Sequence, residues 1–516
     1  MELNIPMRSS RTGMRKVDKF KARPIHESLA EELRDNPEAR EHWKASIHGN
    51  EEWVPAYETH PFVEGASASD RENVLPVAMY LDGAEFAERD SLYIFTVRFC
   101  FSMKRHLVWA IQKSRVCDCG CAGWCTFHAL FQFVSWSLQA LKDNSYPSLS
   151  WDMNPLSGKR AGWAGHILGF VGAVVDILGD WKEIAYTWGF GSWSAYLACF
   201  MCKIKKDELQ DPTAPFTSRD DAEYEIECAA CEIWVAVTSY EALAAIQLNL
   251  VTNRKLKGMV LRKAITLTTP PLKQGDRLEP TSKAPDIMEV FSPKEPFTPL
   301  TLKFWRYGAK HTMHVHHRNP CISRELGVSY MTFGIDILHC MHLGVFLAWL
   351  TRLFQLLIAM DGFQTRTTRK AELWVLSALE IKSRLHAWYP SYERSLSAAA
   401  KKGMTRINHL TDKMLGNAEG TKLVKLKAAE ARHCLPFGVY LCKQFEAELR
   451  EVVDFDSLLL AGECLVEWMA IINREPRKMS RDAVLQLTEA IRKHNVCAAR
   501  AGVHLLPKHH QALLFC

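Results

Sequence analysis

Two aspartates far apart in the chain each close a short apolar run and stand beside a glycine. Asp82 ends the segment VLPVAMYLDG, and Asp180 follows Gly179 at the end of VGAVVDILGD. Carboxylates that hold two divalent ions about 4 Å apart serve phosphoryl transfer, and Mg²⁺ prefers oxygen ligands. The pair therefore predicts a Mg²⁺ or Mn²⁺ centre at the rim of a sheet. The alternative is two aspartates in ordinary turns, where glycine is a favoured neighbour.

A second set of residues predicts a structural zinc site. Cys199 and Cys202 form a Cys-x-x-Cys pair, which is half of a tetrahedral zinc site. The late segment AGVHLLPKHH contains His504 and His509, whose spacing could supply the other two ligands. The alternative is a pair of buried free cysteines with histidines at the surface.

A cysteine-dense loop lies between the two aspartates. Four thiolates within nine residues could hold one zinc ion, but the Cys-x-Cys-x-Cys spacing is tight for an ordinary zinc finger. The alternative is a turn whose thiols only pack. The residues are Cys117, Cys119, Cys121 and Cys125.

Two histidine-containing segments are further candidates. In DILHCMHLGV, Asp336 and His339 share one helix face and could contact a metal or phosphate, or Asp336 could cap a helix whose histidines face the core. A histidine-rich segment before Arg318 could contact a DNA backbone, or could be a solvated connector. Its histidines are His311, His314, His316 and His317.

Composition is that of a globular chain with a modest positive charge. The 516 residues are 48% hydrophobic and 24% charged, enough for two or more domains, and the net charge of +6 is compatible with nucleic-acid binding. The sequence contains no Walker-type phosphate loop, nucleophile elbow or zinc-protease helix, which argues against those enzyme classes.

Cysteine usage and hydropathy predict an intracellular protein. Sixteen cysteines occur without an apolar signal segment, so we expect reduced thiols and no secretion. The most apolar segment, 337–360, contains His339, His342 and Arg352, which favours a buried helix over a membrane span. We therefore expect no membrane partner.

The first 25 residues are basic and contain few acids. Such an arm binds phosphate or acts as a targeting signal, and a disordered soluble tail is the alternative. The residues concerned are Arg8, Arg11, Arg15, Lys16, Lys19, Lys21 and Arg23.

Periodicity predicts the elements that must position these residues. We expect strands over 74–83, 91–101 and 105–113, a helix over 126–141, and a buried strand over 166–178. Three strands, a helix and a strand, with one acid on the first strand and another after the fourth, is the order of an RNase H-like core. After residue 332 the pattern is helical, with helices expected over 337–360, 370–387, 419–432, 435–452, 457–472 and 480–501.

The predicted organisation is a basic arm with a short helix over 1–70, an RNase H-like core over 71–203, and a mixed Cys/His/Pro-rich connector over 204–320. A helical insertion and C-terminal region would occupy 321–516. The fold class is thus α/β plus α: a mixed sheet interrupted by a large all-helical insertion.

Four segments together resemble transposon-derived proteins of the DDE, RNase H-like superfamily. The likeness is greatest to CACTA-type transposases and more distant to the Transib group, which includes the V(D)J recombinase. It covers roughly Val74 to the C-terminus. The segments are LDGAEFAERDSLY, KRHLVWAIQKSRVCDCGCAGWC, GDWKEIAYTWGFGSWSAYLACFMC and IDILHCMHLGV.

The resemblance implies roles for single residues. Asp82 would be the first catalytic acid and Asp180 the second, with Cys199 and Cys202 as zinc ligands together with His504 and His509 (or His510). The last acid of the family's pattern falls after the late histidines, where this chain has none, so we expect a C-terminally truncated or decayed copy. Asp336 is the candidate substitute for that acid.

The function expected from the resemblance is metal-assisted cleavage and transfer of double-stranded DNA strands in the nucleus or elsewhere inside the cell. A homo-oligomer is compatible with it. Two alternatives stay open: a non-catalytic remnant that still binds DNA, and a zinc-stabilised helical interaction protein without a DNA role.

Overall fold

The computed structural model describes residues 1–48, 55–87, 90–117, 123–190, 199, 201–214, 319–417, 422–475 and 479–513. The chain divides into two compact units. Unit 1 comprises Met1–Lys203 and Phe216–Gly334, and unit 2 comprises Ile204–Pro215 and Ile335–Cys516.

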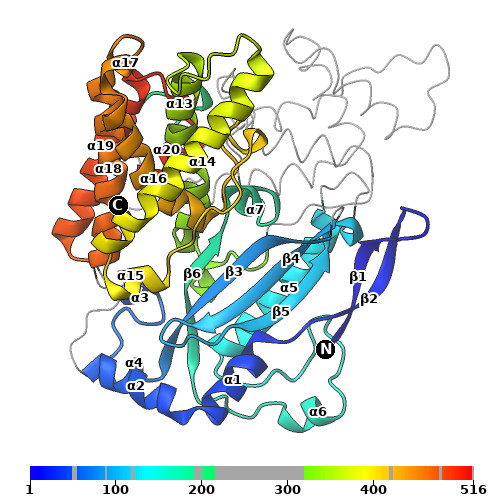
Figure 1. Ribbon diagram of the computed structural model, residues 1–516. Helices are drawn as coiled ribbons and strands as arrows, with labels where there is room; N and C mark the ends of the chain where they lie inside the picture. Colours follow the sequence, from blue (N-terminus) through cyan, green and yellow to red (C-terminus); the bar gives the residue numbers. More distant parts are fainter. Residues whose placement is uncertain are drawn as a thin grey trace, which may run out of the picture. The chain divides into compact units, whose positions relative to one another are not determined.

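Unit 1 is built on a five-stranded mixed sheet with the order β5-β4-β3-β6-β7 (Figure 1). Strands β3 (Val74–Ala87), β4 (Asp90–Phe99) and β5 (His106–Gln112) form an antiparallel meander. Strand β6 (Val171–Gly179) is parallel to β3, and the short β7 (Phe333–Ile335) lies beyond it. The strands and the helix expected from periodicity are therefore confirmed in type and order.

Strand β3 is longer than its sequence pattern predicts. The sequence placed its end at Asp82-Gly83, but both residues stay in the ladder, with Asp82 opposite Ile94 and Gly83 opposite Tyr93. The Asp-Gly pair was taken for a turn, whereas the ladder with β4 continues to Ala87. Asp82 thus lies inside β3, at the point where pairing with β6 ends.

From Met79 onward, the two faces of β3 differ in burial. Leu75, Val77, Met79 and Leu81 are essentially inaccessible, whereas Tyr80 and Asp82 on the opposite face are half-buried. The buried face is covered by α5 (Trp124–Lys142), and a side chain at Gly172 of β6 would meet Leu141 of this helix at 3.0 Å. Each fully buried leucine or phenylalanine of this face contributes about 1.5–3 kcal/mol.

Helix α5 begins at a position that only glycine suits. Its N-cap, Gly123, has φ of 90°, and an added Cβ would lie 2.8 Å from both Phe127 and Val116. The helix then presents Leu130, Phe131 and Phe133, each with no accessible surface, to the core. The α5 pattern in the sequence is strong because buried positions recur at helical spacing.

The N-terminal segment is not the free basic arm that the sequence indicated. Residues Glu2–Arg8 (β1) and Arg15–Lys21 (β2) form an antiparallel hairpin, and Leu3 and Ile5 are fully buried. The hydroxyl of Thr126 in α5 donates to the carbonyl of Pro6, which ties the hairpin to the core. In β1 the buried apolar residues alternate with polar ones, and the basic residues that follow in β2 concealed that strand period.

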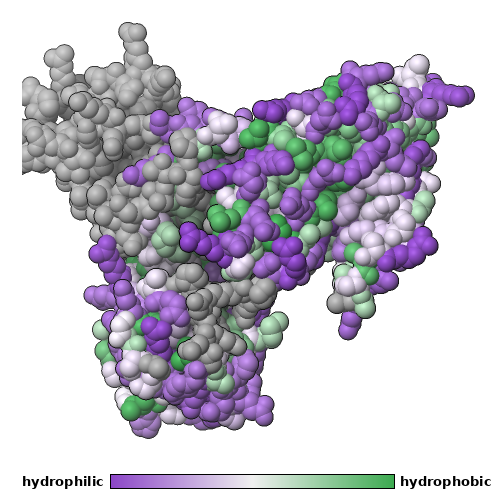
Figure 2. Space-filling model, turned by 90° about the vertical axis from the view of Figure 1, so that its left-hand side faces the viewer, coloured by the Kyte–Doolittle hydropathy of each residue, from purple (hydrophilic) through white to green (hydrophobic). Residues whose placement is uncertain are grey.

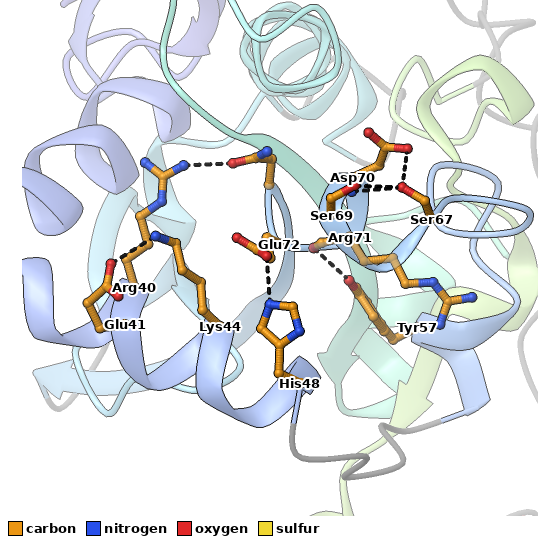
Figure 3. A network of polar contacts seen from close by, with 11 residues as sticks. Arg40, Glu41, Lys44, His48, Tyr57, Ser67, Ser69, Asp70, Arg71 and Glu72 are labelled. Atoms are coloured by element: carbon orange, nitrogen blue, oxygen red, sulfur yellow. Dashed lines mark hydrogen bonds and ion pairs between the residues drawn. The ribbon is translucent and has the colours of Figure 1, made fainter.

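Helices α1 (Ile25–Asp35), α2 (Pro37–His48), α3 (Pro55–Glu58) and α4 (Ala68–Arg71) connect the hairpin to β3. A polar network fixes this connection (Figure 3). Arg40 of α2 donates to the side chain of Asn73 and to the carbonyl of Gly169, which precede β3 and β6 respectively. The Tyr57 hydroxyl donates to the carbonyl of Val74 at 2.9 Å.

Unit 2 is helical in its described part apart from turns and extended links. It begins with a π-helix, η6 (Leu338–Val345), which continues into α13 (Phe346–Ala359). The remaining helices are α14 (Lys370–Ser395), α15 (Ala398–Lys402), α16 (Ala428–Gln444), α17 (Glu446–Arg450), α18 (Phe455–Arg474), α19 (Arg481–Arg500) and α20 (Pro507–Ala512). The space-filling view shows hydrophobic residues among hydrophilic ones on one face of the molecule (Figure 2).

Several helix boundaries predicted in unit 2 are wrong: α14 continues past 387 to Ser395, and the helix expected from 419 begins at Ala428. The sequence pattern ended one helix at 432 and began another at 435, but α16 runs unbroken from Ala428 to Gln444 through Pro436. A proline removes one backbone hydrogen bond from a helix interior. Here Leu435, Phe437 and Leu441 are completely buried, and their packing outweighs that loss.

Among the described residues, one helical segment, Leu338–Ala359, is long and apolar enough to cross a membrane, and 78% of its most apolar window is buried inside the protein. Such burial is typical of a core helix. Taken together, the chain is a mixed α/β unit with a five-stranded sheet and a helical unit.

Trp349 of α13 is the centre of the helical core and depends on two glycines. Its indole nitrogen donates to the carbonyl of Leu458 at 2.9 Å. A Cβ added at Gly438 of α16 would lie 2.6 Å from the indole ring, and one at Gly462 of α18 would lie 2.3 Å from it. The two helices can therefore approach the indole only because these positions lack side chains.

We predict that Gly462→Ala destabilises the protein by ~1–3 kcal/mol, because the fixed indole cannot move away from the added methyl group. Thermal unfolding should show a fall of ~2–10 °C in Tm. The matched control is Gly162→Ala in α6 (Lys159–Trp163), where no atom lies within 4 Å of the added carbon. Equal melting of both variants and the parent would contradict this packing.

Candidate metal centre

Asp82 is held in place by its neighbours on β3. Its carboxylate accepts hydrogen bonds from the Tyr80 hydroxyl at 3.0 Å and from the Gly83 backbone N–H at 2.7 Å. Tyr80 and Asp82 are two residues apart, so strand alternation puts them on the same face of the sheet. The carboxylate is half-buried and keeps access to solvent from that face.

Asp180 links the end of β6 to the following helix, α7 (Trp181–Tyr186). It is the N-cap of α7, with extended backbone angles, and its Oδ1 accepts the N–H of Glu183 at 2.7 Å. Aspartate is among the preferred N-cap residues because its oxygen satisfies an amide that the helix leaves unpaired. Of the residues that the structure describes, none donates a hydrogen bond to the second oxygen, Oδ2.

The register between β3 and β6 brings the two aspartates to neighbouring positions. The paired register ends with Tyr80 opposite Leu178, and Asp82 and Asp180 each follow two residues later, Asp180 as the N-cap of α7. A Cβ added at Gly179 would lie 3.2 Å from the Leu81 carbonyl, which confirms that the strands stay adjacent there. Neighbouring strands are about 4.8 Å apart, and level residues of parallel strands face the same side.

A bulge in β6 decides this alignment. Val77 is opposite Val174, but Ala78 is opposite Asp176, so Val175 is an extra residue without a partner on β3. Without the bulge, every residue of β6 after Val174 would pair one position further along β3. A slip of one residue reverses every side chain that follows it.

A buried ion pair fixes α7 against β3 on the opposite face. Glu183, with 3% of its side chain exposed, lies 3.5 Å from the ammonium of Lys113. Both side chains press on Gly83, where an added Cβ would lie 2.6 Å from Lys113 Nζ and 3.0 Å from Glu183 Oε1. The same ammonium lies 4.4 Å from the ring centroid of Tyr93.

The pKa of the Tyr93 hydroxyl reflects the negative charge at this end of the sheet. Burial raises the pKa of Tyr93 far above its usual value, and the charges of Glu183 and Asp180 raise it further. Lys113 is therefore the counter-charge of a predominantly acidic sheet end. Sequence reasoning missed Glu183 and Lys113, although the spacing Asp180-x-x-Glu183 is close to a capping box and was a usable signal.

Asp336 belongs to unit 2 and has local partners. It directly follows β7, accepts the N–H of Leu338 at 3.0 Å, and lies within hydrogen-bond distance of His339 Nδ1. Burial alone would raise the pKa of Asp336, but the bond from His339 and the Leu338 amide lower it overall. This geometry is that of a residue stabilising the start of a helical segment, the second alternative that the sequence left open.

The Cys-x-x-Cys pair of unit 1 is a buried dithiol. Cys199 and Cys202 have 1% and 0% of their surface exposed, and neither forms a disulfide. Burial raises the pKa of the Cys199 thiol, and the hydrogen bond with Cys202 raises it further. The amide of Met201 points at Cys199 Sγ at 3.3 Å, which favours the thiolate that a metal would require.

The late histidines of unit 2 differ in exposure. His504 is exposed, whereas His509 and His510 are buried. His509 Nδ1 accepts the Leu506 amide, its ring stacks on His494 with centroids 5.6 Å apart, and burial lowers its pKa to about 3. His510 is thus, like Cys199 and Cys202 of unit 1, a buried residue with a side chain that zinc can use as a ligand.

Other candidates cannot be placed or have ordinary roles. In the cysteine-dense loop, the Cys117 amide donates to Thr126, and Cys125 belongs to α5, whereas Cys119 and Cys121 lie outside the described residues. The histidines at 311, 314, 316 and 317 also lie outside them.

Comparisons of the chain with protein-family models, curated proteins and solved structures found no match.

We predict that Lys113→Met lowers the free energy of unfolding by ~1–3 kcal/mol, because it removes the ammonium that lies 3.5 Å from the buried Glu183 carboxylate. Chemical denaturation of the single variant and of Lys113→Met/Glu183→Gln measures the effect, and the double variant should recover much of the loss. Lys44→Met is the control, since Lys44 pairs with the largely exposed Glu41. A double variant as unstable as the sum of its singles would show that the pair is not coupled.

Proposed function

We propose that this chain is a transposase-like protein of the DDE, RNase H-like type, which acts on double-stranded DNA with Mg²⁺ or Mn²⁺. The observation that carries the proposal is that Asp82 lies on β3 just past its last residue paired with β6, the strand that Asp180 directly follows. The order of three antiparallel strands, a helix and a strand parallel to the first supports it further.

The donor set suits a hard divalent cation. Asp82 and Asp180 offer carboxylate oxygens, which Mg²⁺ and Mn²⁺ prefer, and no thiol or imidazole is needed. A bound ion would supply Lewis-acid polarisation of a phosphodiester and activation of a water or a DNA 3′-hydroxyl. The protein's own residues would hold the ion and orient its ligands. Hydrogen bonds from Tyr80 and Gly83 fix the Asp82 carboxylate, and the hydrogen bond from the Glu183 amide of α7 fixes the Asp180 carboxylate.

Only two carboxylates support the proposed centre. Within the described part of unit 1, no third carboxylate, thiol or imidazole has a ligand atom close to both aspartates. Glu183 is neutralised by Lys113 and presses on Gly83, a residue of the opposite face. Since strand transfer normally uses further ligands, we expect slow cleavage, and the non-catalytic DNA-binding protein is the second candidate.

We predict that the full chain nicks supercoiled plasmid in Mn²⁺ and that EDTA stops the reaction. Asp82→Asn or Asp180→Asn should lower the rate ~100-fold or more, because the ion contributes several kcal/mol to the transition state. Asp176→Asn is the matched control, since Asp176 is on the same face of β6, level with Ala78.

Titration with Mn²⁺, followed by electron paramagnetic resonance, separates the outcomes. Mn²⁺ binding that both aspartate variants lose, without any nicking, would support the DNA-binding remnant if DNA retention weakens steeply with salt. Nicking that survives both substitutions would contradict the catalytic assignment.

We also propose that Cys199 and Cys202 are zinc ligands and that His510, in place of exposed His504, is a histidine ligand. The support is chemical: two buried adjacent thiols, an amide directed at one sulfur, and a buried imidazole in the late histidine pair. Zinc sites use such N and S donors, and buried reduced cysteines are the alternative.

We predict one equivalent of zinc per chain in metal analysis, and a chelator should lower Tm because metal binding is coupled to folding. Cys199→Ser, Cys202→Ser and His510→Ala should each lose zinc, whereas His504→Ala should keep it. Absence of zinc, or a Tm that a chelator leaves unchanged, would favour a plain buried dithiol.

A further inference from the structure

A pocket in unit 2 combines several lysines with one tryptophan. It has a volume of about 470 Å³ and is formed by the first turn of α14, the turn η7 (Asp412–Met414) and the segment after it. Its lining residues are Lys370, Trp374, Asp412, Lys413, Gly416, Asn417, Lys422 and Lys425. The lining residues thus include four lysines and one aspartate.

The positive charge of this pocket is largely uncompensated. Lys413, Lys422 and Lys425 are exposed, and in the described residues of unit 2 none of them forms an ion pair. Surface lysines elsewhere in this unit do have carboxylate partners, as in Lys443–Glu463. Uncompensated positive charge in a concave surface attracts anions, and the field is strongest inside the hollow.

The pocket wall is fixed by backbone contacts. Gly416 has φ of 92°, and an added Cβ would lie 2.5 Å from the Lys422 carbonyl, so only glycine fits this turn. The Lys425 amide donates to the Met414 carbonyl at 2.7 Å, and the Val424 amide donates to Thr351 of α13 at 2.9 Å. Lys422 and Lys425 therefore lie on a segment that backbone hydrogen bonds hold in place.

Trp374 gives the pocket a flat apolar wall. It is half-buried and lies one helical turn after Lys370, so both side chains leave α14 on the same face. An indole beside ammonium groups suits a ligand that carries both phosphate and an aromatic ring. Proteins bind unpaired nucleic-acid strands with this combination of basic groups and stacking aromatics.

We infer that this lysine pocket binds an unpaired nucleic-acid strand, with its lysines on the phosphates and Trp374 against one base. The volume matches that of a nucleotide-sized ligand. In a duplex the bases are stacked on their neighbours and cannot reach the indole, so an unpaired strand fits better. A membrane fits less well, because the indole lines a hollow and does not project from a flat face.

The inference deepens the proposed function, since it assigns unit 2 a role in holding DNA, but its test does not depend on cleavage. The experiment measures anisotropy of a fluorescein-labelled 20-nucleotide oligo(dT) with the full chain over 50–200 mM salt. Lys422→Gln/Lys425→Gln should weaken binding and reduce the slope of log K against log salt by about 1.4, or 0.7 for each phosphate contact. Trp374→Leu should weaken binding ~5-fold or more without changing that slope, and Trp374→Phe should retain most of it.

The control is Lys401→Gln/Lys402→Gln, which removes the same charge from exposed positions on α15 outside the pocket. It should bind oligo(dT) like the parent, and equal Tm values show that all variants are folded. The inference would be overturned if both lysine double variants lost the same affinity, or if the pocket variants bound oligo(dT) like the parent. It would also be overturned if the parent did not bind oligo(dT), or if it bound only to anionic phosphatidylserine vesicles.

Asp82→Asn/Asp180→Asn separates the two proposals. This variant should bind oligo(dT) normally, so loss of nicking with intact strand binding affects the catalytic proposal alone. If the parent nicks DNA but the pocket variants bind oligo(dT) like the parent, only the inference about the pocket is contradicted.

Discussion

The pairing of β6 with β3 is the constraint on which the candidate site depends. Two strands joined in parallel place level residues on one face, and the extra residue Val175 sets which residues are level. Because of that bulge, Leu178 lies opposite Tyr80, and Asp180 follows the strand as the N-cap of α7. A bulge leaves one residue unpaired and locally disrupts the ladder, so its position beside two carboxylates is informative. Here the bulge sets the register of the strand that Asp180 follows.

The surroundings keep this alignment fixed. On one face, Tyr80 orients Asp82. On the other, α7 is held by its Asp180 cap and by the buried pair of Glu183 and Lys113 across Gly83. These contacts hold the two carboxylates in place, so in the proposed centre neither would have to move before a cation binds. Preorganised carboxylates are useful in phosphoryl transfer because the enzyme does not reorganise when charge develops.

Periodicity in the sequence was sufficient for the core elements. The strands β3 to β6 and the helix α5 follow from apolar spacing, and so does the position of Asp180 directly after β6. The bulge at Val175 could not be predicted, because GAVVDIL is a continuous apolar run in which no period marks an extra residue. The hairpin β1–β2 was missed because its lysines and arginines dominate the pattern, although Leu3, Ile5 and Met7 alternate. In α16, the burial of the residues around Pro436 outweighs the helix-breaking tendency of proline, on which the predicted boundary was based.

The most direct test of the central claim is crystallographic. Crystals of the full chain soaked in Mn²⁺ and measured at the manganese absorption edge would locate the ion by anomalous scattering. The account predicts a peak ligated by carboxylate oxygens of both Asp82 and Asp180, at about 2.0–2.3 Å from each. Manganese bound only elsewhere, or side chains of the two aspartates directed to opposite faces of the sheet, would contradict it.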